Sequence, residues 1–272
     1  MSRLTTTFDR LRADRRTGLV TYVTAGDPDL PRSREILLAL DRAGADVLEV
    51  GVPFSDPLAD GPVIQRATER ALAAGTTLPR VLALVADIRP RVAAPIVLFT
   101  YANPVARLGF ATFAKRAAAA GVDGVLALDL PIEEADELHG ELEQACLASI
   151  FLLSPTTTTE RIRRAAELGR GFLYAISRLG VTGARETVAS GAAALVARIR
   201  AETALPIALG FGISSPAHVA EVGHFADAAV VGSALVSVIA EHGAAADLVP
   251  EVERYIRWLK GAESPAPAGQ VP

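Results

Sequence analysis

The stretch VLEVGVPFSDPLADGPVIQRA, residues 47–67, joins a short apolar run to a loop rich in proline, glycine and aspartate. The run VLEVG has the length and composition of a strand that is covered on both faces. Its one charged side chain, Glu49, lies late in the run. The end of the stretch resembles a helix start, because DGP is typical of an N-cap followed by proline in the first turn. The stretch therefore predicts one strand–loop–helix unit.

The same unit recurs along the chain. Similar apolar runs, which we expect to be strands, occupy residues 18–24, 47–51, 95–101, 124–130, 149–154, 172–177, 206–212 and 228–233. Segments of helical periodicity separate them. About eight such units in about 240 residues favour a (β/α)8 barrel, which typically needs ~250 residues. A doubly wound open sheet is the alternative, but no G-x-G-x-x-G follows the first run.

No linker divides the chain, so we expect residues 1–262 to form one catalytic barrel domain. Leu4, Phe8 and Leu11 recur at helical spacing near the N-terminus and predict an extra helix that packs under the barrel. Residues 263–272 are rich in proline and glycine and offer nothing to bury. We expect them to form a disordered tail.

The composition argues against several classes of function. The chain has 272 residues, a net charge of -4 and no basic run interleaved with aromatic residues, which argues against a nucleic-acid or acidic-membrane partner. Its one cysteine and four scattered histidines have no zinc-site spacing, so we expect no metal. Residues 1–16 lack the apolar core of a signal peptide, and no apolar run reaches ~18 residues. A cytoplasmic location is the expectation.

Glu49 is the first candidate for chemistry, because barrel active sites lie at the carboxyl ends of the strands. A structural ion pair is the alternative, but the strands supply almost no lysine or arginine, and Arg178 is the nearest candidate partner. A buried carboxyl group without a partner should have a raised pKa. Such a pKa suits a general acid or base.

Three aspartates at strand ends leave two interpretations open. Asp60 could cap the helix that follows it or act in the site, and the residues favour neither. Asp56, in SDPL, could be an ordinary turn residue. Asp129 ends the fourth run, and capping and ligand contact are equally plausible there.

Glycine-rich loops follow the last three runs, in SRLGVTGARE (177–186), GFGISSP (210–216) and GSALV (232–236). Ordinary turns could explain each of them. Glycines at three adjacent strand ends, however, favour a phosphate site, because the last loop should open a helix whose free N–H groups face an anion. The first loop is also long enough to act as a lid over the site.

Together these residues resemble the α subunit of tryptophan synthase over roughly residues 3–260. The segments that carry the resemblance are TYVTAGDPD (21–29), LEVGVPFSDPLADGPVIQRA (48–67), YANPV (101–105), GVDGVLALDLPIEE (121–134), SRLGVTGAR (177–185), GFGIS (210–214) and VVGSALV (230–236). The second is the most specific, because it contains both acids and the loop between them. The resemblance implies a (β/α)8 barrel that cleaves indole-3-glycerol phosphate to indole and glyceraldehyde 3-phosphate without a cofactor of its own.

The resemblance also assigns roles to single residues. Glu49 matches the catalytic acid and base, and Asp60 matches the second catalytic acid. The phosphate contacts implied are Gly183, Gly212, Ile213, Gly232, Ser233 and Ala234. The implied indole pocket comprises Tyr22, Tyr101, Leu128, Tyr174 and Val231, with Tyr22 where the family often has phenylalanine. Thr182 matches a lid residue that contacts Asp60.

A partner follows from the resemblance as well. Such α subunits work with a β subunit that condenses indole with serine on pyridoxal phosphate, in an α2β2 heterotetramer. The implied contact residues are Pro53, Asp56, Asn103 and Pro104. A free-standing lyase that releases indole is the main alternative. A catalytically dead regulatory subunit and another phosphosugar barrel are disfavoured, the first by the presence of Glu49 and Asp60 and the second by the specificity of residues 48–67.

Overall fold

The computed structural model describes residues 2–176, 191–210 and 212–262. In this part of the chain the strands are β1 (Gly18–Thr24), β2 (Val47–Gly51), β3 (Ile96–Thr100), β4 (Gly124–Ala127), β5 (Ala148–Ser149), β6 (Leu152–Leu153), β7 (Leu173–Ile176), β8 (Ile207–Gly210) and β9 (Ala228–Val231). Every pair is parallel, in the order β5-β4-β3-β2-β1-β9-β8-β7-β6. The eight expected runs thus all contain strands, and the fifth run is divided between β5 and β6.

The divided fifth strand closes the sheet into a barrel. β5 pairs with β4 and β6 pairs with β7, so the two halves lie at opposite ends of the strand order. Only Ile150 and Phe151 separate them. The Ile150 N–H donates to the Val125 carbonyl at 2.9 Å, and the Tyr174 N–H donates to the Phe151 carbonyl at 3.0 Å. The prediction of a (β/α)8 barrel is therefore confirmed, and the alternative of a doubly wound sheet is excluded.

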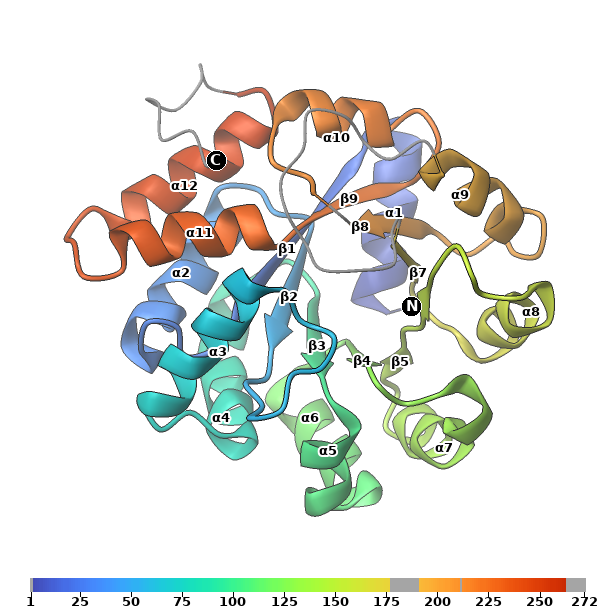
Figure 1. Ribbon diagram of the computed structural model, residues 1–272, viewed down its shortest axis with the longest axis horizontal. Helices are drawn as coiled ribbons and strands as arrows, with labels where there is room; N and C mark the ends of the chain where they lie inside the picture. Colours follow the sequence, from blue (N-terminus) through green and yellow to red (C-terminus); the bar gives the residue numbers. More distant parts are fainter. Residues whose placement is uncertain (1, 177–190, 211, 263–272) are drawn as a thin grey trace.

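Helices other than α1 (Arg3–Ala13) form a ring outside the strands (Figure 1). The helices of the ring are α2 (Leu30–Arg42), α3 (Pro62–Ala73), α4 (Leu78–Ile88), α5 (Ala102–Leu108), α6 (Phe110–Ala120), α7 (Asp136–Gln144), α8 (Thr159–Leu168), α9 (Ala192–Arg200), α10 (Pro216–Val222), α11 (Ser233–His242) and α12 (Leu248–Leu259), with 3-10 turns at Arg89–Arg91 and Ile132–Glu134. α2 shows how the sequence specifies them. The side chain of its N-cap, Asp29, accepts from the Arg32 N–H at 2.8 Å. Its buried stripe includes Ile36, Leu37 and Leu40.

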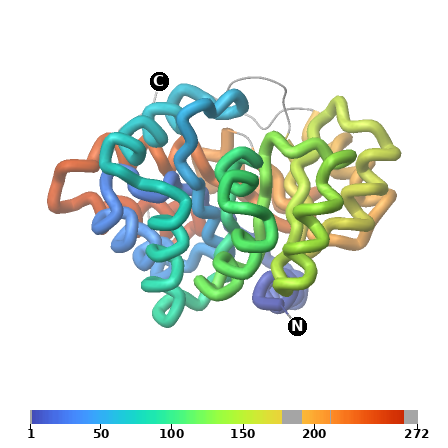
Figure 2. Tube along the Cα trace, turned by 90° about the horizontal axis from the view of Figure 1, so that it is seen from below, coloured from blue at the N-terminus to red at the C-terminus, as the bar shows by residue number. Residues whose placement is uncertain are grey.

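The expected N-terminal helix is α1, and it closes the amino end of the barrel. Leu4, Phe8 and Leu11 are buried in one cluster with side chains from inside the barrel. The Phe8 ring lies 5.5 Å from that of Phe172. Figure 2 shows α1 at the lower edge of the molecule, at the end marked N. With this end plugged, the carboxyl ends of the strands are left for a site.

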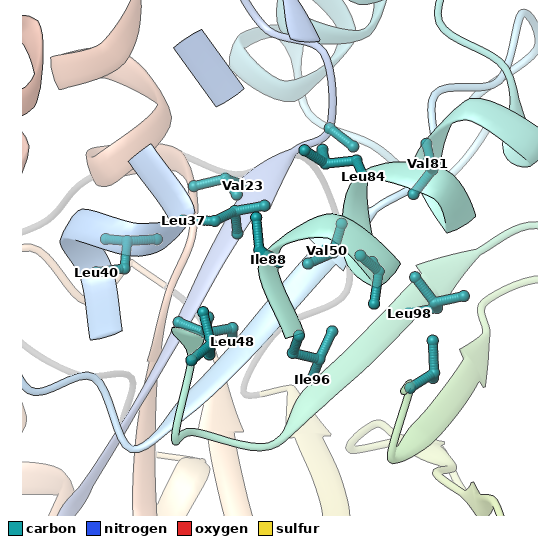
Figure 3. Close-up of a cluster of buried hydrophobic side chains, with 14 of the residues drawn as sticks. Val23, Leu37, Leu40, Leu48, Val50, Val81, Leu84, Ile88, Ile96 and Leu98 are labelled. Carbon is teal, nitrogen blue, oxygen red and sulfur yellow. The ribbon is translucent and has the colours of Figure 1, made fainter. Parts of the chain in front are cut away.

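Alternation along each strand divides the core into two layers. Between β2 and the helices, Leu48 and Val50 pack with side chains of α2 and α4 (Figure 3). Val47 belongs instead to the cluster inside the barrel. Because side chains two residues apart share a face of a strand, Glu49 points into the barrel with Val47.

Three aspartates fasten the amino ends of neighbouring strands. Asp46, Asp123 and Asp227 directly precede β2, β4 and β9. Their carboxylates accept backbone N–H groups of the adjacent strands, from Leu19 at 3.0 Å, Ile96 at 2.8 Å and Ile207 at 2.8 Å. Each also pairs with basic side chains. Carboxylates at the amino ends of these strands thus have structural partners.

Within the described residues, no single helix is both long and apolar enough to cross a membrane. The segments Pro62–Ala73 and Leu78–Arg91 reach the required length and composition only as a pair, and they meet at a bend of 92°.

Candidate active site

Glu49 is a carboxyl group buried inside the barrel. Its side chain is 0% exposed, and neither carboxyl oxygen has a hydrogen-bond partner among the described residues. Burial in an apolar barrel disfavours the charged form and raises the pKa of Glu49 from 4.5 to about 8. The group is therefore mostly a neutral carboxylic acid at pH 7, and it can donate a proton.

Asp60 lies in the loop between β2 and α3 and is not the cap of that helix. Gly61 is the N-cap of α3, in an extended conformation with φ -76 and ψ 165. The capping interpretation of Asp60 is therefore wrong. Its side chain is buried, and burial raises its pKa from 3.8 to about 6, although the Tyr101 hydroxyl acts in the opposite direction. At pH 7 this carboxyl group is mostly ionised.

Two tyrosines bring phenol groups to the same end of the barrel, and glycines make room for both. Tyr22 lies beside Glu49 in the β1–β2 register. A Cβ atom on Gly51 would approach the Tyr22 hydroxyl oxygen to 2.3 Å, and one on Gly210 would approach that of Tyr174 to 2.5 Å. Glycine is therefore required at these two strand ends. The glycine-rich loop after β8 was expected to bind phosphate, and its Gly210 also makes room for Tyr174 of the neighbouring strand β7.

The acids and the phenols influence one another. Burial raises the pKa of Tyr22 well above its ordinary value, and the charge of Asp60 adds more than that of Glu49. Burial likewise raises the pKa of Tyr174, with Glu49 as the next cause. The Tyr22 hydroxyl lies 3.4 Å from Thr24 Oγ1. Both phenols are thus neutral donors in the electrostatic field of the two carboxyl groups.

The loop after β9 opens directly into α11. Gly232 is the N-cap, without a side-chain cap, and the Val236 N–H is the one that donates back to its carbonyl, at 3.0 Å. The N–H groups of Ser233 and Ala234 precede that first helical bond and have no acceptor within the helix. A Cβ on Gly232 would lie 3.7 Å from Tyr22 Cβ, so this helix start is close to the tyrosine beside Glu49.

Of the other expected phosphate contacts, Gly212 has a φ of 69°, in the left-handed region, and Ile213 is buried. Gly183 and the expected lid residue Thr182 lie outside the described residues.

The expected pocket residues do not all share one face. Leu128 packs against the cluster inside the barrel, and Tyr174 belongs to it. Tyr101 is buried directly after β3, and its ring lies 5.1 Å from that of Phe54. Val231 instead belongs to the helix-facing cluster, while its neighbour Val230 points inward.

The expected partner residues Pro53 and Asp56 lie in the loop after β2, and Asn103 and Pro104 lie in the first turn of α5. The two segments meet at Tyr101, whose hydroxyl accepts from the Ala59 N–H at 3.3 Å. Asp56 and Asn103 are exposed, Pro104 is half-buried and Pro53 is buried. Leu58, in the first of these loops, is 96% exposed, and no other large hydrophobic residue in the described ranges is classed as exposed. Sequence reasoning missed Leu58, since an apolar residue in a loop gives no sign of its exposure.

No group of three or more histidine, cysteine, aspartate or glutamate side chains in the described ranges could hold a metal ion. The arrangement offers a protonated carboxyl group, Glu49, and an ionised one, Asp60, near an open helix start. The fold and this pair define a (β/α)8-barrel enzyme of the acid–base type.

A family model described as tryptophan synthase alpha chain matches residues 8–261. The chain belongs to the tryptophan synthase alpha chain family.

Relatives and solved structures agree with this assignment. The tryptophan synthase alpha chain of Geotalea daltonii is 51% identical over 236 residues, which cover 87% of this chain and 89% of the relative. That of Geobacter sulfurreducens is 49% identical over 262 residues, covering 96% and 99%. The structure of Mycobacterium tuberculosis tryptophan synthase matches with a TM-score of 0.89 and 40% identity, over 96% of this chain and 98% of that one. Tryptophan synthase subunit alpha from Legionella pneumophila gives 0.89 and 38%, over 96% and 98%.

Proposed function

We propose that this chain cleaves indole-3-glycerol phosphate to indole and glyceraldehyde 3-phosphate, with Glu49 as the acid and base and Asp60 as the second acid. Family membership supports the reaction. The observation that carries the assignment of residues is the burial of Glu49 without a partner, which raises its pKa to about 8. The alpha chain performs this step without a cofactor, and pyridoxal phosphate belongs to the β chain.

Glu49 would act twice in one turnover. The neutral carboxyl group first protonates C3 of the indole ring, and the resulting indolenine has a positive charge on its nitrogen. The Glu49 carboxylate then takes the proton of the glycerol hydroxyl group next to the scissile bond. A C=O bond forms, the C–C bond breaks, and its electron pair returns to the ring and neutralises the nitrogen. Proton and charge balance, and Glu49 is again a neutral acid.

Asp60 would stabilise the charge that the first proton transfer creates. An ionised carboxylate that faces the indole N–H lowers the energy of the indolenine, because charge stabilisation in a site without water is strong. Its pKa of about 6 keeps it ionised at pH 7, while Glu49 remains protonated. Two carboxyl groups with separated pKa values can therefore serve as proton donor and as anion at the same pH.

The remaining contacts follow the family resemblance. For the phosphate we propose the backbone at Gly212, Ile213, Gly232, Ser233 and Ala234, with Gly183 from the loop outside the described residues. The free N–H groups at the start of α11 support this assignment.

For the indole ring we propose Tyr22, Tyr101, Leu128 and Tyr174. Val231 would contribute through its backbone, because its side chain packs toward the helices. Thr182 remains the proposed lid residue.

The chain works with a tryptophan synthase β chain in an α2β2 complex. We propose Pro53, Asp56, Asn103 and Pro104 as contact residues. We further propose that residues 1–262 form the catalytic domain and that the protein is cytoplasmic. A free-standing lyase would carry the same acids, so the two alternatives differ in their response to the β chain.

The test is the rate of indole release from indole-3-glycerol phosphate by the chain alone and with the β chain. We expect measurable cleavage that rises with the β chain, and we expect Glu49→Gln to lower it by about 10²–10⁴-fold in both cases. Strong activity that the β chain leaves unchanged would favour the free-standing lyase. Full activity of Glu49→Gln would refute the proposed role of Glu49.

A further inference from the structure

Asp129 follows β4, and its carboxylate caps a helix that belongs to a different strand–helix unit. Asp129 Oδ1 accepts a hydrogen bond of 2.6 Å from the N–H of Ala102, the first residue of α5. The N-cap of α5 is Tyr101, whose side chain makes no capping hydrogen bond. A neighbouring loop therefore supplies the acceptor that the first turn of α5 lacks.

Tyr101 connects this cap to the loop that carries Asp60. Its hydroxyl accepts a hydrogen bond from the Ala59 N–H at 3.3 Å, and its interaction with Asp60 lowers the pKa of that carboxyl group. Burial is the main cause that raises the pKa of the Tyr101 phenol, the charge of Asp60 comes next, and the charge of Asp129 adds a smaller contribution. The loops after β2, β3 and β4 are thus joined by contacts that begin at Asp129 and end at Asp60.

We infer that Asp129 is a positioning residue for the reaction: it fixes the start of α5 and, through Tyr101, the carboxylate of Asp60. The inference rests on the proposed function of Asp60. Asp129 itself is exposed, and its observed contact is with a backbone N–H. The contact needs an oxygen acceptor at this position rather than a negative charge.

A direct contact between Asp129 and the substrate is the competing role. Asp129 lines a hollow at the carboxyl ends of β4 and β6 together with Leu128 and Arg161. A carboxylate that contacted the substrate there would act through its charge. Substitution by asparagine separates the two roles, because asparagine caps helices about as well as aspartate but has no charge.

The experiment measures kcat, KM and the pH profile of indole-3-glycerol phosphate cleavage, in complex with the β chain, for the wild type, D129A, D129N and E133A. Glu133 is the matched control, since it is an exposed carboxylate that closely follows Asp129 in the chain and pairs with Arg161. We expect D129A to lower kcat about tenfold, with little change in KM. A lost helix cap costs roughly 1 kcal/mol, and a barrier raised by about that much slows a reaction close to tenfold. D129N should retain most of the wild-type kcat, and E133A all of it.

The pH profile tests the path through Tyr101. Loss of the Tyr101 contact should raise the pKa of Asp60, so the acid limb should move to higher pH in D129A and in Y101F. D129A should add no further movement in the Y101F background. The position of the limb does not depend on the fraction of enzyme that is folded, so a partly unfolded variant still reports it.

If the wild type is active and D129A has the same kcat and the same acid limb, the inference is wrong while the proposed function stands. D129N as impaired as D129A would overturn it in favour of substrate contact, and an additive movement of the limb in the double variant would exclude the path through Tyr101. A wild-type chain that does not cleave the substrate even with the β chain would refute the proposed function, and this inference with it.

Discussion

Glu49→Gln should make the protein more stable than the wild type, by an amount that grows with pH. The folded chain raises the pKa of Glu49 from 4.5 to about 8, whereas the unfolded chain restores the ordinary value. A carboxyl group with a raised pKa lowers the free energy of unfolding as pH rises, because the unfolded state releases the proton more readily. Glutamine has nearly the same shape and no proton to release.

The magnitude follows from 1.36 kcal/mol for each pKa unit. Near pH 5 the raised pKa lowers the free energy of unfolding of the wild type by about 1 kcal/mol. Near pH 9 it lowers it by about 5 kcal/mol, because the pH is then above both pKa values. The difference in unfolding free energy between Glu49→Gln and the wild type should therefore increase by about 4 kcal/mol over this range. The elevated pKa of Asp60 is common to both proteins and cancels.

Urea unfolding at a series of pH values measures this difference, with the two proteins compared at each pH. The difference between the two urea midpoints should be nearly constant below pH 4.5, the ordinary pKa. It should grow as pH rises toward about 8 and level off above that value. A constant difference from acid to alkaline pH would refute the reasoning, because it would mean that Glu49 titrates in the folded protein as it does in the unfolded chain.

Three further results are expected. The pH profile of kcat/KM should be bell-shaped, with an acid limb near 6 where Asp60 ionises and an alkaline limb near 8 where Glu49 loses its proton; a flat profile across this range would contradict both assignments. Asp60→Asn should lower kcat by about 10²–10³ and remove the acid limb in the same assay, and an unchanged limb would assign it to another group. Leu58→Ala should weaken binding of the β chain by about 1–2 kcal/mol in calorimetry while the chain's own lyase rate stays the same; unaltered affinity would exclude this exposed leucine from the interface.

Much of the barrel could be predicted from the sequence, because its signal is local. Each buried strand needs a short apolar run, and each of the eight runs contains one. The division of the fifth run could not be predicted, since Ile150 and Phe151 are as apolar as their neighbours. Their place between β5 and β6 depends on how the barrel closes, which involves strands far apart in the sequence.

The site could be predicted from the sequence where a charged residue lies within an apolar run. Glu49 is a charge in an apolar run, and that conflict alone indicated its burial and its raised pKa. Asp60 was ambiguous because the sequence DGP fits a helix cap equally well, and only the backbone of Gly61 excludes that role. The contact of Asp129 with Ala102 depends on two neighbouring loops, so no local pattern could reveal it.

The protonation state of Glu49 at neutral pH is the central claim, and infrared difference spectroscopy measures it directly. Spectra of the wild type minus Glu49→Gln isolate the C=O stretch of this one protonated carboxyl group. We predict that the band is present near pH 7 and disappears with a midpoint near 8. A band that is already absent at pH 7 would show that Glu49 is ionised, and the acid role proposed for it would be wrong.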